Sequence, residues 1–345
     1  MSEIDLKALS KEQIDAFTRE AGLPAFRGRQ IIHWIYERYA HTIEDITELS
    51  KTLREELSEK AHISNLVQLE RLTSADGTQK FLFRLQDGET IESVLISDED
   101  RLTLCISSQV GCAMGCVFCL TGKSGLKRNL GPHEIIDQII SVNRLILPKR
   151  ITNIVLMGMG EPLANFDNAV EALRRMTGLM MISPRRVTLS TSGIVPKIAE
   201  VGRMGLKVNI AVSLNATTDA VRDIIMPVNK TYPIRTLLNA SSEYSLAANR
   251  SIMFEYVMLK GINDSPEDAH RLVRLLKGIP SKVNLIPFNA YSGCDYEKPD
   301  DSTVLRFQEI LAQAKMIVLI RKSKGQDILA ACGQLKAGNK VGALP

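Results

Sequence analysis

Cys112, Cys116 and Cys119 lie within a single short segment, GCAMGCVFCL at 111–120, although the whole chain has only six cysteines. Three thiols this close cannot all pair with one another, so a disulfide, a zinc site, an iron–sulfur cluster and chance are the possible explanations. A structural zinc site usually closes four ligands, and no second cysteine pair lies nearby to complete one. A cluster held by three thiolates leaves one iron open to substrate or cofactor. The spacing therefore favours an iron–sulfur cluster with an open iron, with zinc and coincidence as alternatives.

The composition is that of an ordinary soluble protein. The chain has 345 residues, 45% of them hydrophobic and 24% charged, and it contains no apolar run of the roughly 18 residues that a membrane span needs. The N-terminal segment lacks the apolar core of a secretory signal, so we expect a cytoplasmic protein with no membrane partner. A reducing compartment argues against structural disulfides. The net charge of +4 permits an RNA partner without establishing one.

The chain divides into four expected parts. Residues 1–62 show helical periodicity and form an accessory module, with Ser50 as a predicted N-cap. Residues 63–99 alternate like strands around Asp76-Gly77 and Asp87-Gly88, which predicts a short β-meander linker. Residues 100–320 form the main domain, and residues 321–345 form a tail that looks too flexible to join a core.

Within the main domain, strand and helix patterns alternate. This alternation predicts an α/β fold with a parallel sheet, and the number of repeats is too small for an eight-fold barrel. We therefore expect a partial (β/α)6 barrel. The predicted strands are 101–107, 151–157, 186–190, 208–214, 251–259, 282–288 and 316–320.

Unusual residues gather just after these strands, where ligands of such folds bind. The segments are the cysteine segment, GMGEP at 158–162, STSG at 190–193, SLNA at 213–216 and PFNAYSG at 287–293. C-x3-C-x2-C is the signature of the radical S-adenosylmethionine (SAM) enzymes, and Gly160 and Glu161 resemble the glycine–glutamate motif of that superfamily. The resemblance implies one [4Fe–4S] cluster held by Cys112, Cys116 and Cys119, with SAM on the open iron.

Taken together, the ordered motifs resemble the radical SAM RNA adenine-C2 methyltransferases, which act on 23S ribosomal RNA and on tRNA. The resemblance covers essentially the whole chain and includes CISSQVGCAMGCVFCL, RRVTLSTSGIVP and RKSKGQDILAACGQL. The residues implied to contact SAM are Gly160, Glu161, Ser190, Ser213, Leu214, Asn215 and Asn289. Two positions depart from the pattern: many members have His where this chain has Asn215, and often glycine where it has Lys315.

The resemblance also implies roles for residues outside the cysteine segment. Cys332 matches the cysteine that is methylated by a first SAM and carries the carbon to adenine C2, so that two SAM are used per turnover. Cys105 matches the resolving cysteine, which closes a disulfide with Cys332 as the product leaves. Glu92 matches the acceptor of the C2 proton.

Other functions stay open at this point. A sister branch methylates C8 of the same ribosomal adenosine, although the proline of GMGEP is more typical of the C2 branch. A non-catalytic iron–sulfur electron-transfer protein and a zinc-stapled RNA-binding module are rivals from other classes. The expected partners are the RNA substrates and an electron donor such as flavodoxin or ferredoxin, and the enzyme is expected to be a monomer.

Overall fold

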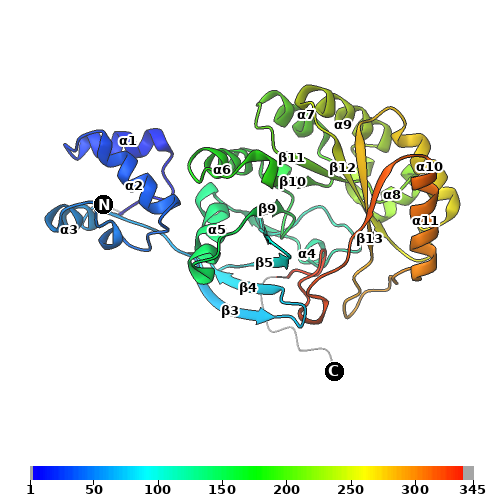
Figure 1. Cartoon of the computed structure of the whole chain (residues 1–345), viewed down its shortest axis with the longest axis horizontal. Coiled ribbons are helices and arrows are strands. Elements are labelled where there is room, and N and C mark those ends of the chain that lie inside the picture. The colour runs from blue at the N-terminus through cyan, green and yellow to red at the C-terminus, as the bar shows by residue number, and fades with distance from the viewer. Residues whose placement is uncertain (1–2, 337–345) are drawn as a thin grey trace.

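The computed structural model describes residues 3–336, with the side chains of 246–248 excepted. Its centre is a sheet of ten strands in the order β14-β13-β12-β11-β10-β9-β6-β5-β4-β3. Helices cover the outside of this sheet, and a small helical module extends from one side of the molecule (Figure 1). No helix in the described part of the chain combines the length and the apolar character that crossing a membrane requires.

Seven strands of the sheet are parallel and form the barrel wall. They are β6 (Arg101–Cys105), β9 (Asn153–Leu156), β10 (Val187–Thr191), β11 (Asn209–Ser213), β12 (Ile252–Met258), β13 (Ser281–Pro287) and β14 (Ile317–Ile320). Each neighbouring pair in this series is joined in parallel register, and β14 pairs only with β13, so the barrel stays open. The predicted partial barrel is thereby confirmed, with six crossovers between seven strands.

The crossovers run through helices on the outer surface of the sheet. These helices are α5 (Pro132–Ile146), α6 (Phe166–Gly178), α7 (Val195–Arg203), α8 (Asp219–Ile225), α9 (Ile234–Ala248), α10 (Pro266–Leu276) and α11 (Asp301–Gln313). The helix α10 shows why the chain turns helical where it does. The side chain of Ser265 accepts a hydrogen bond from the Asp268 amide, and Pro266 occupies the first turn, where a missing amide proton costs nothing.

The β-meander consists of β3 (Val67–Thr73), β4 (Gln79–Arg84) and β5 (Thr90–Asp98), which pair antiparallel. Its two turns place Gly77 at φ 82° and Gly88 at φ 87°, a left-handed conformation that glycine adopts without strain. Strand β5 also pairs antiparallel with β6. The meander therefore extends the barrel sheet, in addition to linking the N-terminal module to it.

The N-terminal module contains α1 (Lys11–Glu20), α2 (Phe26–Tyr36), α3 (Lys51–Ser58) and the short parallel pair β1 (Ile4–Asp5) and β2 (Ala61–His62). Ser50 caps α3 by accepting a hydrogen bond from the Leu53 amide, as predicted. A two-stranded ribbon thus ties together the start and the end of a segment whose sequence pattern is otherwise helical.

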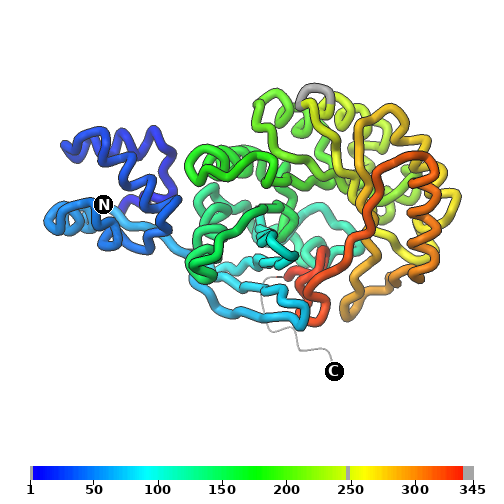
Figure 2. Tube along the Cα trace, viewed as in Figure 1, coloured from blue at the N-terminus to red at the C-terminus, as the bar shows by residue number. Residues whose placement is uncertain are grey.

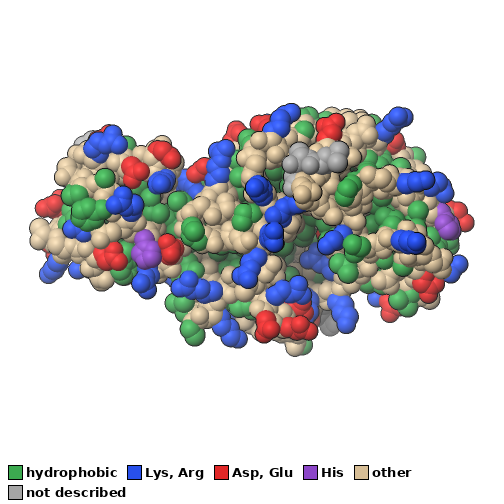
Figure 3. Space-filling model, turned by 45° about the horizontal axis from the view of Figure 1, so that its top comes forward, with side chains coloured by type: hydrophobic (Ala, Val, Ile, Leu, Met, Phe, Trp, Pro, Cys, Tyr) green, Lys and Arg blue, Asp and Glu red, His purple; other side chains and the backbone are tan. Residues whose placement is uncertain are grey.

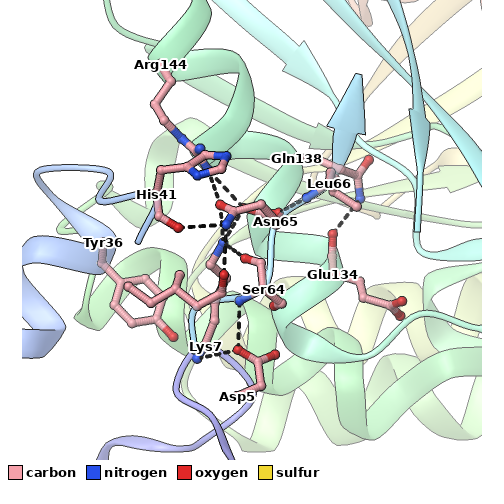
Figure 4. A network of polar contacts seen from close by, with 12 residues as sticks. Asp5, Lys7, Tyr36, His41, Ser64, Asn65, Leu66, Glu134, Gln138 and Arg144 are labelled. Carbon is pink, nitrogen blue, oxygen red and sulfur yellow. Dashed lines mark hydrogen bonds and ion pairs between the residues drawn. The ribbon is translucent and has the colours of Figure 1, made fainter. Parts of the chain in front are cut away.

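A buried ion pair attaches this module to the barrel. Lys7 Nζ lies 2.6 Å from Asp137 Oδ1 on α5, and it also donates to the carbonyl of Ser64. Burial lowers the pKa of Lys7, and the negative charge of Asp137 opposes that change. Asp137 Oδ2 accepts a hydrogen bond from the Leu66 amide. Figure 4 shows Lys7 among these groups, where the module meets the barrel.

The segment after β14 turns back onto the meander, beside the hairpin end of β3 and β4 (Figures 1 and 2). Asp327 Oδ1 accepts a hydrogen bond from Ser74 Oγ at 2.6 Å, and the Gly325 amide donates to Asp76 Oδ2 at 2.8 Å. Leu335 is buried in the main core. The expectation that this tail cannot join a core is therefore wrong for 321–336; residues 337–345 lie outside the described part.

Candidate active site

One pocket opens at the carboxyl ends of the parallel strands. About 990 Å³ of space there is not filled by protein atoms, open solvent at the mouth included. Ten predicted site residues line it, and they are Cys112, Cys116, Cys119, Gly160, Glu161, Ser190, Ser213, Asn215, Asn289 and Cys332. Three others, Glu92, Cys105 and Leu214, are not among the lining residues.

The cysteine segment forms a loop between β7 (Gln109–Gly111) and α4 (Leu120–Lys123), with β8 (Leu126–Asn129) beyond. At Gly111 the backbone has φ 78°, and a Cβ there would overlap the carbonyl oxygen of Gly125. The Cys112 amide donates to that carbonyl at 2.9 Å, and the Cys119 amide donates to the Cys116 carbonyl at 3.1 Å. The three thiols therefore stand on a backbone that is already ordered by its own hydrogen bonds.

The three thiols of the loop fit a metal cluster. Burial raises the pKa of Cys112 to about 12, and it raises the pKa of Cys116 still further. Thiols with such a high pKa ionise only beside a strong positive charge, and bound metal ions supply that charge. All three cysteines of the loop line the same pocket, so each could give one thiolate to one cluster.

Glu161 links the ends of two barrel strands. Its carboxylate accepts hydrogen bonds from the Leu163 amide at 2.9 Å and from the Ser192 amide at 2.6 Å. Its own amide donates to Gln109 Oε1 at 2.8 Å. Burial raises the pKa of Glu161, and these hydrogen bonds oppose the change. Both carboxylate oxygens are thus bound to backbone amides, so the side chain of Glu161 holds the strand ends together. The preceding residue, Gly160, lines the pocket with its backbone.

Asn215 occupies a left-handed position, with φ 57°. Asparagine tolerates this region better than most residues. Its Oδ1 accepts a hydrogen bond from the Val257 amide at 2.8 Å, and its Nδ2 contacts Met226 Sδ at 3.1 Å. Leu214 is fully buried behind the pocket wall, so only its backbone is available to shape the site.

Cys105 and Cys332 approach the site from opposite ends of the chain. Cys105 lies at the end of β6 and is buried, whereas Cys332 lines the pocket, where its surface is open to the cavity but surrounded by protein atoms. Burial raises the pKa of Cys105 to about 12; the charge of Cys332 adds to the rise, and the positive charge of Arg321 opposes it. The carbonyl of Cys332 accepts a hydrogen bond from Asn289 Nδ2 at 3.3 Å. All six cysteines are free thiols in this structure.

Glu92 lies on β5 and only 6% of it is exposed. Lys80 Nζ lies 3.1 Å from Glu92 Oε1, and the amide of Lys336 donates to Glu92 Oε2 at 2.8 Å. Burial raises the pKa of Glu92, with the charge of Lys80 acting against it. The carboxylate thus contacts the tail four residues beyond Cys332, although it does not line the pocket itself.

Comparison with known proteins identifies the family. The model of the Radical SAM superfamily matches residues 106–273, and that of the "Ribosomal RNA large subunit methyltransferase N-terminal domain" matches residues 4–63. The "Dual-specificity RNA methyltransferase RlmN" of Geotalea uraniireducens (strain Rf4) is 52% identical over 338 residues, which cover 97% of each chain. The protein of that name from Geobacter sulfurreducens is 51% identical over 96% of this chain and 92% of its own. This chain belongs to the radical SAM dual-specificity RNA methyltransferase family.

A solved structure agrees with this assignment. The "radical SAM methyltransferase from Sphaerobacter thermophilus" superposes with a TM-score of 0.93 at 40% identity, covering 96% of this chain and 99% of its own. The cofactors of this radical SAM methyltransferase are accordingly a [4Fe–4S] cluster and SAM. The desolvated thiols and the strand-end pocket described above suit both.

Two charged residues of the pocket were missed in the sequence analysis. Glu255 lies on β12 and Arg321 directly follows β14, and both line the pocket with Cys332. Burial raises the pKa of Glu255, which Arg321 opposes, and Glu255 Oε2 accepts a hydrogen bond from Asn284 Nδ2 at 2.8 Å. A signal for each was present in the sequence. An acidic residue interrupts the apolar run SIMFEYVML, and Arg321 stands at a strand end.

Proposed function

We propose that this radical SAM methyltransferase methylates C2 of adenosine in 23S ribosomal RNA and in tRNA, through an S-methylcysteine at Cys332 and with two SAM per turnover. The observation that carries the proposal is the shared pocket. Cys332 enters it from the tail, while Cys112, Cys116 and Cys119 enter it from the loop after β7. A thiol that carries a methyl group must lie beside the cofactor that activates it, and this arrangement supplies that proximity.

In this proposal the bound cluster and SAM supply the methyl group and the one-electron chemistry. The residues of the chain hold the cluster and SAM in place. Cys112, Cys116 and Cys119 hold the cluster, and the backbone and side chains at the strand ends hold SAM. These SAM contacts are Gly160, Glu161, Ser190, Ser213, Leu214, Asn215 and Asn289. Leu214 would act through its backbone, since its side chain is buried behind the wall.

Release of the product needs a proton acceptor and a thiol. Glu92 is proposed to take the proton from adenine C2, and its raised pKa makes it a stronger base than an exposed carboxylate. Cys105 is proposed to attack the sulfur of Cys332 as a thiolate. The bond from that sulfur to the carbon then breaks, the carbon takes a proton to become the methyl group of the product, and a disulfide forms that an external thiol or other reductant opens before the next turnover. The positive charge of Arg321 supports this step, because it lowers the pKa of both thiols against the effect of burial.

An adenosine must leave its stack to reach such a pocket. Figure 3 shows Lys and Arg side chains around a hollow in the middle of one face, a suitable surface for phosphate groups. Two of the basic residues near the pocket are already paired, Lys127 with Glu89 and Arg128 with Glu134. We further propose a monomeric enzyme in the cytoplasm, with a low-potential donor such as flavodoxin or ferredoxin.

Analysis of the modified base tests the proposal. The anaerobically reconstituted enzyme is incubated with reductant, RNA and SAM that carries a deuterated methyl group, and the digested nucleosides are separated by liquid chromatography and mass spectrometry. We expect 2-methyladenosine from both a 23S RNA fragment and tRNA. The product 8-methyladenosine would place the chain in the sister branch. An intact cluster without any methylated nucleoside would favour a non-catalytic iron–sulfur protein.

A further inference from the structure

Arg222 is a fully buried guanidinium on α8. Its Nε donates to the carbonyl of Leu214 at 2.9 Å, and its Nη2 donates to the carbonyls of Ser192 at 2.8 Å and Ser213 at 3.0 Å. Its Nη1 donates to Asn229 Oδ1 at 3.0 Å. One side chain thus holds the backbone where β10 and β11 end, at the wall of the SAM pocket.

Every one of these acceptors is neutral. Within the described residues, no carboxylate lies close enough to Arg222 to form an ion pair. The acidic groups that act on it, Asp219 and Asp223, both accept hydrogen bonds from Asn229 Nδ2 instead. Burial lowers the pKa of Arg222 to about 10, so the group remains charged near neutral pH. A buried cation without an ion-pair partner is costly unless an anion lies nearby.

The cysteine loop is the neighbour that can supply the anion. The amide of Val117 donates to the carbonyl of Ile225 at 3.2 Å, which joins the loop to the last turn of α8. Ile225 packs in one apolar cluster with Cys116. Arg222 lies one helical turn before Ile225, and its charge and that of Cys116 act on each other. A cluster bound by three thiolates is anionic, and its reduction adds one more negative charge.

We propose that Arg222 is a positioning residue that places a fixed positive charge beside the cluster and raises its reduction potential, while its hydrogen bonds hold the strand ends that face SAM. The inference rests on the proposed ligand role of Cys112, Cys116 and Cys119. In the step concerned, one electron passes from a low-potential donor to the cluster, and no bond or proton is exchanged. Nearby charge and hydrogen bonding are established determinants of cluster potentials.

The test is a redox titration of the reconstituted protein, with dithionite and mediators and without SAM, followed by electron paramagnetic resonance of the reduced cluster. We expect Arg222→Gln and Arg222→Met to make reduction at least about tenfold less favourable, which is about 59 mV for a one-electron couple. Arg222→Lys keeps the charge but cannot serve all the acceptors, so its potential should stay near that of the wild type while SAM binds more weakly.

Arg175 provides the matched control. It is also a buried arginine that bonds to backbone, but it lies on α6 and donates to the Lys7 carbonyl, at 2.8 Å, and to the Tyr36 hydroxyl of the N-terminal module rather than to residues of the pocket wall. Arg175→Gln should leave the potential unchanged. Equal potentials in the wild type and in both neutral Arg222 variants, with full iron content, would overturn the inference.

Iron content separates the remaining outcomes. If both neutral variants fail to load the cluster but Arg222→Lys loads it, the positive charge is needed to hold the anion, which supports the inference. If the lysine variant also fails to load, the hydrogen-bond geometry rather than the charge is what matters, and the electrostatic role is refuted. A wild-type protein that binds no cluster would instead refute the proposed ligands.

Discussion

The amide of Lys336 donates a 2.8 Å hydrogen bond to Oε2 of Glu92. The contact joins the tail that carries Cys332 to β5, the last strand before the barrel begins, so the proposed methyl carrier and the proposed base belong to one connected unit. Lys80 reinforces this unit, since its Nζ lies 3.1 Å from Glu92 Oε1 and also donates to the carbonyl of Leu329 at 3.3 Å.

Replacement of Glu92 should stop release of the product. Glu92→Gln retains an acceptor for the Lys336 amide but cannot take a proton, so we expect turnover to fall by about 10² to 10⁴-fold and protein-linked RNA to accumulate. Single-turnover assays with labelled RNA on denaturing gels measure both effects. Glu70→Gln, on the exposed strand β3, is the control. Normal release by the Glu92→Gln enzyme would show that another group accepts the proton.

The release step should depend on pH through Glu92. Burial raises the pKa of this carboxyl, Lys80 opposes the rise, and only the ionised form accepts a proton. The release rate should therefore increase with pH through the raised pKa and then level off. Lys80→Met should move this limb to higher pH. The contribution of Glu92 to folding stability changes with pH in the opposite direction to the release rate. It is fully present below the pKa that Glu92 has in the unfolded chain, and it is lost as pH rises through the raised pKa of the folded protein. If the release rate of Lys80→Met rose over the same pH range as that of the wild type, Glu92 would not be the titrating group.

Replacement of Cys332 and replacement of Cys105 should block the reaction at different steps. Cys332→Ala removes the carrier of the carbon and should abolish methylation. Cys105→Ala should still form the protein–RNA link but leave it unresolved, as a slowly migrating band on denaturing gels. Cys294→Ala, in the segment after β13 but not among the residues that line the pocket, should behave like the wild type. Free methylated RNA from the Cys105→Ala enzyme would contradict the resolving role.

Iron analysis tests the cysteine loop. Anaerobic reconstitution should give about four irons per chain, and Ala in place of Cys112, Cys116 or Cys119 should remove most of them together with the visible absorbance of the cluster. Cys294→Ala should retain the full iron content. A preparation that contains only zinc and still methylates RNA would rule out the cluster.

The ion pair of Lys7 and Asp137 should matter for stability rather than chemistry. Lys7→Met leaves the buried Asp137 carboxylate with only the more distant Arg144, 3.7 Å away, as a cationic partner, and we expect the free energy of unfolding to fall by up to about 3 to 5 kcal/mol. The double variant Lys7→Met/Asp137→Leu should recover much of this loss, since no buried charge then lacks a partner. Lys51→Met, from an exposed pair with Glu55, is the control. Urea denaturation measures the free energy of unfolding of all three variants. If the loss in the double variant equalled the sum of the losses caused by the two substitutions separately, Lys7 and Asp137 would not be coupled.

Local sequence was enough to predict what depends on near neighbours. The C-x3-C-x2-C loop, the Ser50 cap and the glycine turns of the meander each rest on residues a few positions apart, and the structure contains them all. The alternation of strands and helices likewise predicted the open parallel barrel. The tail was misjudged because its burial depends on Ser74 and Asp76, about 250 positions away, which bind Asp327 and Gly325.

The sequence by itself determined the chemistry that is available: three clustered thiols, three further thiols, and polar residues after the strands. Only the tertiary structure decided which of these groups meet, and which charges act on them. Arg222 and Glu255 lie in no motif, and Arg321 only begins one, RKSKGQDILAACGQL, that gave it no role of its own. The importance of all three follows from burial beside the pocket, where a charge has few water molecules to screen it. Electrostatic interaction depends on distance in space and on the surrounding medium, and neither is a property of position along the chain.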